Sequence, residues 1–251
     1  MNTTKTPDSS DDEMLKLSDA ERRLLDKSSL ISREQRLYEL LQELQVTRET
    51  TQHKNNDLHQ AEIRLEIAGL QLDLDDRENA WQNARSVIDT FIEQQKFEDA
   101  ALAAQYVYLC NREDAISAIG QAAWLSVTYP VSPQLTANIL DHIIDETPDK
   151  SDGAAVAAAT AQYVADLRCV TKEQEPVKLF TGSMLARVAR RHSKVENKAQ
   201  FEQWVQQLEL DNPARFLVRL RNVVDVMVQE DWWFDRDKLT SALPEHDSSE
   251  G

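Results

Sequence analysis

The chain has 251 residues and carries 44 acidic against 28 basic side chains, a formal net charge of −16. Such a surface repels phosphate backbones and anionic lipid headgroups over a Debye length, which argues against non-specific binding of nucleic acid by the chain as a whole. Only five glycines and seven prolines interrupt a sequence rich in Ala, Leu, Gln and Glu, and this composition predicts an all-α fold.

The two ends of the chain are polar and acidic. Residues 1–17 and 243–251 hold too few apolar side chains to offset the entropy of ordering, so both are expected to be disordered tails. The first of them lacks the apolar stretch of a signal peptide, and no run of 18 apolar residues occurs anywhere. We therefore expect a cytoplasmic protein without membrane insertion. Cys110 and Cys169 have no CxxC partner and are predicted to be small core residues.

A coiled-coil-like helical segment is predicted for residues 18–76. Residues 18–21 (Ser-Asp-Ala-Glu) match a capping box that opens a short helix, and residues 32–35 (Ser-Arg-Glu-Gln) match one that opens a longer helix. Apolar side chains then recur at seven-residue spacing, at Leu37, Leu44, Leu58, Leu65 and Leu72. Such a seam is typical of a helix that pairs with another helix. We expect self-association, or the binding of a protein partner, through residues 32–76.

The middle of this segment leaves its topology open. Residues 47–57 are nearly all polar, so the segment is either one long helix with a weak centre or a helical hairpin that turns near residues 54–56. Its second half carries further apolar side chains at Ile63, Ile67, Leu70 and Leu74. Two apolar stripes on one helix predict packing against more than one neighbour.

A multi-helix array is predicted for residues 78–170. Residues 97–100 and 114–118 resemble the stacked helical hairpins of tetratricopeptide repeats, but no 34-residue period recurs and the consensus Gly and Pro positions are absent. We interpret the pattern as helix-pair packing rather than as membership of that family. Ser132 and Pro133 form an N-cap and first-turn pair that opens a further helix.

The last part of the array is expected to be an Ala-rich helix at residues 154–168. A polar linker at 171–176 follows, and a small helical unit is predicted for 177–242. Its first four residues, 177–180, are the best candidate for a strand in the chain. Asn212 and the proline after it predict the start of a late helix.

Three adjacent aromatic side chains, Trp232, Trp233 and Phe234, lie near the end of this unit. Three neighbouring rings cannot all face one core, so at least one is expected in a groove or at an interface, where aromatic area contributes most. The plainer interpretation is a C-terminal segment clamped over the helical core.

Charge is segregated along the chain. Residues 178–221 carry nine Lys and Arg against four acids, whereas residues 225–251 carry eight acids against two bases. Four of the cations, Arg187, Arg190, Arg191 and Lys194, recur at helical spacing and share one face. This face would pair with the acidic C-terminal segment or with an acidic partner. Alternatively, residues 184–204 form a helix-turn-helix that contacts DNA.

Evidence for catalytic chemistry is thin. Asp141 and Asp145 are four residues apart, with Glu146 beside them, as two metal-ligating carboxylates on one helix would be. A solvated acidic face explains the same spacing. The sequence has no Walker lysine motif, no GxGxxG and no GxSxG. We therefore predict no catalytic residue, no metal and no cofactor.

These observations rank three functional classes. The first is a non-catalytic adaptor or scaffold that binds other proteins through its helices. The second is a dimeric DNA-associated transcriptional regulator that uses the basic face at 184–204. The third is an all-α metal-dependent hydrolase built on Asp141, Asp145 and Glu146.

Overall fold

The computed structural model describes residues 19–50 and 55–243, with side chains for 27–49 and 57–243; Ser18 and most of the two predicted tails lie outside these ranges. All regular structure in the described residues is helical, so the all-α prediction is confirmed. In chain order the helices are α2 (Asp19–Thr50), α3 (Asn55–Asp73), α4 (Arg77–Arg85), α5 (Ile88–Glu93), α6 (Phe97–Leu109), α7 (Ala115–Thr128), α8 (Pro133–Asp145), α9 (Asp152–Arg168), the 3-10 helix η1 (Lys172–Gln174), α10 (Glu175–Ser193), α11 (Lys198–Gln207), α12 (Pro213–Val228) and α13 (Arg236–Ser241). None of them is long and apolar enough to cross a membrane.

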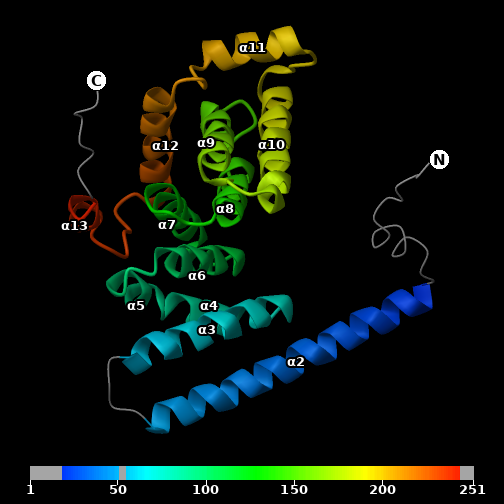
Figure 1. Ribbon diagram of the computed structural model, residues 1–251, viewed down its shortest axis with the longest axis vertical. Helices are drawn as coiled ribbons and strands as arrows, with labels where there is room; N and C mark the ends of the chain where they lie inside the picture. The colour runs from blue at the N-terminus through cyan, green and yellow to red at the C-terminus, as the bar shows by residue number, and fades with distance from the viewer. Residues whose placement is uncertain (1–18, 51–54, 244–251) are drawn as a thin grey trace, which may run out of the picture.

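The N-terminal segment is a helical hairpin rather than one long helix. Figure 1 shows α2 and α3 side by side at one end of the molecule. Leu40 and Leu44 of α2 are buried against Ile63 and Ile67 of α3, in a small core separate from the main one. Ion pairs follow the same antiparallel register, from Arg36 Nε to Glu66 Oε1 at 2.9 Å and from Arg33 Nε to Asp73 Oδ2 at 3.3 Å.

The predicted heptad seam is divided between two cores by this turn. Leu44 packs on α3 with Leu37 partly buried beside it, whereas Leu65 is buried in the main core with Leu58 packed against that core. Leu72 is half-buried. Helix α3 therefore lies between α2 and the rest of the protein, and its two apolar stripes face two neighbours as predicted.

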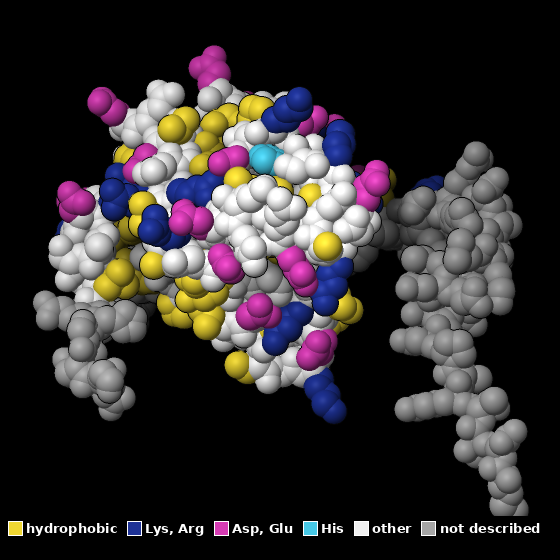
Figure 2. Space-filling model, turned by 90° about the horizontal axis from the view of Figure 1, so that it is seen from above, with side chains coloured by type: hydrophobic (Ala, Val, Ile, Leu, Met, Phe, Trp, Pro, Cys, Tyr) yellow, Lys and Arg dark blue, Asp and Glu magenta, His cyan; other side chains and the backbone are white. Residues whose placement is uncertain are grey.

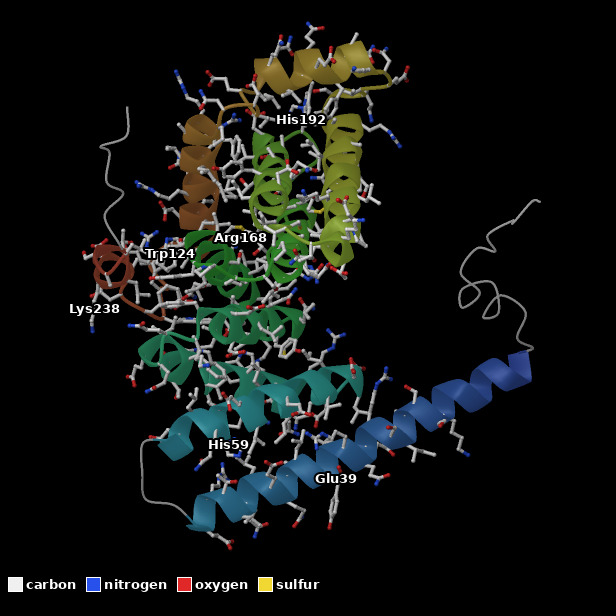
Figure 3. The ribbon with its side chains drawn as sticks, in the orientation of Figure 1. Glu39, His59, Trp124, Arg168, His192 and Lys238 are labelled. Carbon is white, nitrogen blue, oxygen red and sulfur yellow. The ribbon has the colours of Figure 1, made fainter. Side chains whose placement is uncertain are left out.

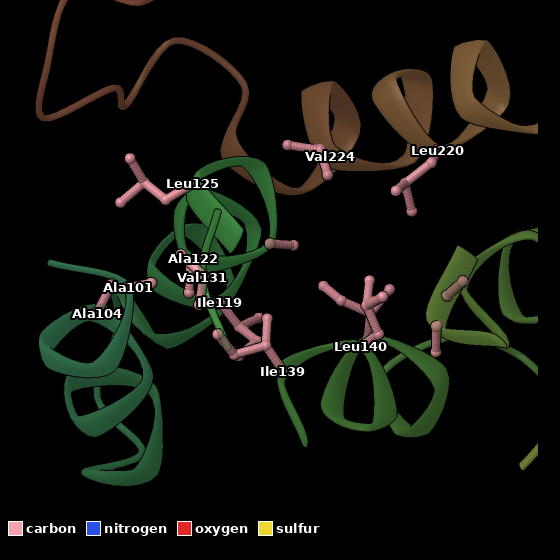
Figure 4. Close-up of a cluster of buried hydrophobic side chains, with 14 of the residues drawn as sticks. Ala101, Ala104, Ile119, Ala122, Leu125, Val131, Ile139, Leu140, Leu220 and Val224 are labelled. Atoms are coloured by element: carbon pink, nitrogen blue, oxygen red, sulfur yellow. The ribbon is translucent and has the colours of Figure 1, made fainter. Parts of the chain in front are cut away.

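The remaining helices stack on one another around a single main core. Figure 4 shows side chains of α6, α7, α8 and α12 converging there, including Ile119, Leu140 and Val224. Helix α12 returns along the stack to pack on α7 and α9. The core thus joins residues of the predicted array with residues of the predicted C-terminal unit. Close helix approach depends on small residues: a Cβ at Gly120 would lie 2.7 Å from Val228 Cγ2.

Helix ends are completed largely without glycine. Asp75, Gln95, Asn111, Lys194 and Glu209 adopt φ values between 52° and 60°, each just after a helix. After α5, the Lys96 N–H donates to the Phe91 carbonyl at 2.8 Å, which is the 6→1 hydrogen bond of a Schellman motif. A protein with many helices can therefore contain only five glycines.

Arginine side chains from neighbouring helices complete several C-termini. The Arg168 guanidinium donates to the carbonyls of Ser126 and Val127 at the end of α7, at 2.8 and 3.1 Å. Arg191 donates to Ile144 O at the end of α8, and Arg219 to Leu208 O after α11. Unpaired carbonyls and the negative end of the helix dipole make a guanidinium a favourable partner at these positions.

Two local predictions were wrong. Ser32 does not open a helix, because α2 continues through it from Asp19 without a glycine or proline to interrupt it. Residues 177–180 form no strand but belong to α10, where Val177 is buried against α8 and α9 side chains. Burial of one face of α10 outweighed the strand propensity of Val177 and Phe180. The polar linker at 171–176 contains η1 and the first two residues of α10. The helix starts at Pro133 and Pro213 were correct.

Candidate functional site

The basic face of α10 is partly occupied by the acids of α8 and the loop after it. Arg187 pairs with Asp141 and lies 4.0 Å from Asp145 Oδ1, and Arg191 Nε lies 3.5 Å from Asp149 Oδ1. Arg187 of the basic face is therefore the partner of the carboxylate pair Asp141 and Asp145. Neither arginine pairs with a described residue of the acidic C-terminal segment, which was one of the two expected partners of this face.

The other two cations of this face lack such ion pairs among the described residues. Arg190 and Lys194 are exposed, and neither makes an ion pair with a residue that the structure describes. Seen from above, basic and acidic side chains are interspersed over the α11 end of the molecule rather than gathered into separate areas (Figure 2). Such a mixture favours internal pairing over a continuous positive surface for phosphates.

The acids of α8 do not converge on a metal position. Among the described residues, no group of three or more His, Cys, Asp or Glu side chains could hold a metal ion. His142 sits between these acids in sequence but packs against the Tyr108 ring, with centroids 4.8 Å apart. Burial lowers the pKa of His142, although the neighbouring carboxylates act in the opposite direction.

His192 joins four helices at the upper end of the stack (Figure 3). Its Nε2 lies 3.2 Å from Asp152 Oδ1, and its Nδ1 lies 2.6 Å from Ser193 Oγ and accepts from Trp204 Nε1 at 3.2 Å. Asp152 also pairs with Arg219 Nη2 at 2.9 Å. The order Asp-His-Ser is that of a hydrolase triad. Here, however, the indole N–H competes with the hydroxyl for one lone pair, and Arg219 shares the carboxylate. The arrangement fits a junction between helices better than an activated nucleophile.

The C-terminal segment is clamped onto the stack by specific contacts. The buried side chain of Gln121 accepts from Trp233 N at 2.8 Å and donates to Asp231 O at 3.1 Å. Tyr129 Oη donates to Leu239 O at 3.2 Å. These bonds pair the backbone of a segment that has little regular structure of its own.

The three adjacent aromatic residues divide between the stack and a groove. Trp232 and Phe234 pack around Trp124 of α7, with centroid distances of 6.1 and 5.5 Å. The guanidinium of Arg236 lies 3.9 Å from the centroid of Trp232. Trp233 and Phe234 also line an open groove of about 690 Å³ between α5 and α13.

The groove is lined by apolar side chains and by three carboxylates. Five of its apolar side chains come from the α5–α6 region, from the end of α7 and from α13: Ile92, Phe97, Tyr129, Pro130 and Leu239. Phe97 and Tyr129 stack at a centroid distance of 3.5 Å. Asp89, Glu93 and Asp235 supply the carboxylates, and Lys238 is the single cation that lines the groove within the described residues. Figure 3 shows Lys238 on α13, at the edge of the molecule.

A second apolar surface lies on α2, away from α3. Ile31, Tyr38 and Leu41 follow at intervals of seven and three residues, which places them on one face of the helix, and Leu30 lies next to them. The exposed fractions are 42% for Leu30, 52% for Ile31, 64% for Tyr38 and 44% for Leu41. We call these four residues the α2 stripe.

The start of α2 also extends past its partner. Arg33 pairs with Asp73, the last residue of α3, so the residues before Arg33 lie beyond the end of α3. Figure 1 shows this part of α2 projecting from the body of the molecule, and its described apolar side chains, Leu30 and Ile31, are exposed there.

Sequence reasoning named none of the four α2 stripe residues and did not assign Gln121, Phe97 or Tyr129 to a site. The stripe could have been found as a second periodicity in α2, hidden beside the stronger Leu37 and Leu44 pattern. A single glutamine on an Ala-rich helix gives no sequence signal. Comparison with protein-family models, with curated proteins and with solved structures found no match to this chain.

Proposed function

We propose that this protein is a non-catalytic helical scaffold that self-associates through the α2 stripe. The observation that carries the proposal is the exposed apolar face of Leu30, Ile31, Tyr38 and Leu41 on a helix whose adjacent face is already packed on α3. Water-exposed apolar side chains that continue along a projecting helix are typical of a surface that pairs with another helix.

Charge favours a second copy of the same chain as the partner. Residues 27–36 carry three cations, Lys27, Arg33 and Arg36, against one carboxylate, and Arg33 and Arg36 also pair with Asp73 and Glu66 of α3. Residues 37–49 carry three carboxylates against one cation. Two antiparallel copies of α2 would place the positive half of each helix against the negative half of the other, with Ile31 near Leu41 of the second copy. A two-fold axis makes one stripe sufficient for both sides of the interface.

Sedimentation velocity over a wide range of concentration tests this proposal. The wild-type chain is expected to reach twice its mass of 28.7 kDa. The double variant Ile31→Glu plus Tyr38→Glu should remain a monomer, because each dimer would bury four uncompensated carboxylates. Leu179→Glu plus Val218→Glu is the matched control, since both residues are exposed and apolar but lie on α10 and α12. A wild-type monomer at every concentration would refute self-association, and equal loss in the control would refute the role of α2.

A further inference from the structure

The groove between α5 and α13 lies on the opposite side of the molecule from the projecting part of α2 (Figure 1), and it is lined by different residues. Its floor combines aromatic rings with Ile92 and Leu239, and it is open enough to admit a side chain from another molecule. We infer that this groove is a binding site for a short peptide segment that carries an aromatic or branched aliphatic anchor flanked by lysine or arginine.

The apolar part of the inference rests on how the groove is built. The Tyr129 hydroxyl and the Gln121 carboxamide hold the C-terminal segment against the stack, so the wall formed by Trp233 and Phe234 is in place before any partner binds. A volume of about 690 Å³ lies within the range of sites that enclose several side chains. A preformed pocket lowers the ordering cost of binding.

The preference for a basic partner rests on unpaired carboxylates. Asp89, Glu93 and Asp235 line the groove, and none of them makes an ion pair with a Lys or Arg of the described chain. Many other carboxylates of this surface are paired, among them Asp141 with Arg187 and Asp225 with Arg236. Asp235 Oδ1 also accepts from Lys238 N at 3.0 Å as the N-cap of α13, so Asp89 and Glu93 are the carboxylates that Lys or Arg side chains beside an apolar anchor would reach first.

A small cationic ligand held by aromatic faces fits the groove less well. The guanidinium of Arg85 already lies 4.3 Å from the centroid of Trp233, which lines the groove. Tyr129 is stacked on Phe97. The ring faces that a cation cage requires are therefore partly occupied, whereas Asp89 and Glu93 form no ion pair with a described Lys or Arg.

The C-terminal residues of the chain itself have the wrong charge for this site. Residues 244–251 contain Glu245, Asp247 and Glu250 and no Lys or Arg. Like charges at short range oppose binding beside Asp89 and Glu93. We therefore assign the groove to a separate, basic partner rather than to this segment.

Selection of a displayed library of random dodecapeptides on the full chain tests the inference. The enriched sequences are expected to combine an aromatic or branched aliphatic residue with at least two Lys or Arg. Fluorescence anisotropy with the resynthesised peptides should show at least tenfold weaker binding to Asp89→Lys plus Glu93→Lys. The milder pair Asp89→Asn plus Glu93→Gln should weaken binding in the same direction. Glu196→Lys plus Asp211→Lys changes the net charge equally, away from the groove, and should bind as the wild type does.

Several outcomes would overturn the inference. They are a selection without binders, enrichment of acidic peptides, or equal weakening by the groove and control variants. A chain that ends at Leu243 and binds the peptides tenfold more tightly would show that residues 244–251 occupy the groove, which contradicts a separate partner. The Ile31→Glu plus Tyr38→Glu variant should bind the peptides normally, so this inference stands or falls independently of the α2 stripe.

Discussion

Replacement of Arg168 by Met should cost more stability than any other single loss of a surface charge in this protein. The guanidinium connects the end of α9 to the end of α7 and to the turn that follows it. It donates to Ser126 O and Val131 O at 2.8 and 2.9 Å from Nη1, and to Val127 O at 3.1 Å from Nη2. Methionine keeps the aliphatic packing of the side chain but leaves these carbonyls without their donor.

The magnitude follows from the three bonds and the partial exposure of the group. A hydrogen bond from a charged donor contributes about 1.5–3 kcal/mol. Arg168 is only half-buried, so water replaces part of the loss, and Thr136 Oγ1 keeps its contact of 3.3 Å with Ser126 O. We expect the free energy of unfolding to fall by about 2–4 kcal/mol, and the melting temperature by about 5–15 °C for a chain of this size.

Urea denaturation followed by circular dichroism at the helical band measures this change. Arg190→Met is the matched control, because Arg190 is an exposed arginine that makes no ion pair with a described residue, and its loss should change stability by less than about 0.5 kcal/mol. Arg168→Lys keeps the charge without the planar fork and should recover less than half of the loss. A loss below about 1 kcal/mol in Arg168→Met, or an equal loss in the control, would refute the assignment of the guanidinium as a helix cap.

Three further predictions concern backbone, packing and protonation. Gln95→Gly should raise the free energy of unfolding by about 0.5–1 kcal/mol, because Gln95 has φ 56° after α5; an unchanged urea midpoint would contradict this. Gly120→Val should lower the free energy of unfolding by about 1–3 kcal/mol or more, since its Cβ would lie 2.7 Å from Val228 Cγ2. The double variant Gly120→Val plus Val228→Ala should recover part of this loss in the same assay. Burial lowers the pKa of His142 below its ordinary value of 6.5, so the unfolded chain takes up this proton first as the pH falls. The stability linked to this pKa difference is therefore complete above pH 6.5 and is lost as the pH falls through the folded-state pKa of His142. The free energy of unfolding, measured between neutral and mildly acidic pH, should fall less in His142→Gln than in the wild type. The same pH dependence in both proteins would exclude this role of His142.

The hairpin shows where sequence patterns were sufficient and where they were not. Two apolar stripes on residues 58–74 require two neighbours, so periodicity alone predicted that this segment packs on more than one side, without identifying the helices on either side. Whether the polar stretch at 47–57 ends a helix depends on what the flanking helices bury. That choice is made by the pairing of Leu40 and Leu44 with Ile63 and Ile67, which are distant along the chain.

The charged residues illustrate a similar division. The spacing of Arg187 and Arg191 placed them correctly on one helical face, but their partners come from α8 and the following loop, more than 40 residues earlier. Coulomb interactions depend on distance in space, and net charge per segment pointed to the C-terminal acids instead. Only the packing of α10 against α8 brings Arg187 and Asp141 together.

By itself, the amino-acid composition with its helical periodicity determined an all-α protein, the proline-marked starts of α8 and α12, and the acidic character of the surface. These properties depend on local backbone preference and on which side chains repeat every three or four residues. Tertiary structure alone decided that the leucine seam is internal, that the α2 stripe is uncovered, and that Trp233 and Phe234 form the wall of a groove. Each of these depends on long-range contacts such as Gln121 to Trp233, which are 112 residues apart and leave no trace in local sequence.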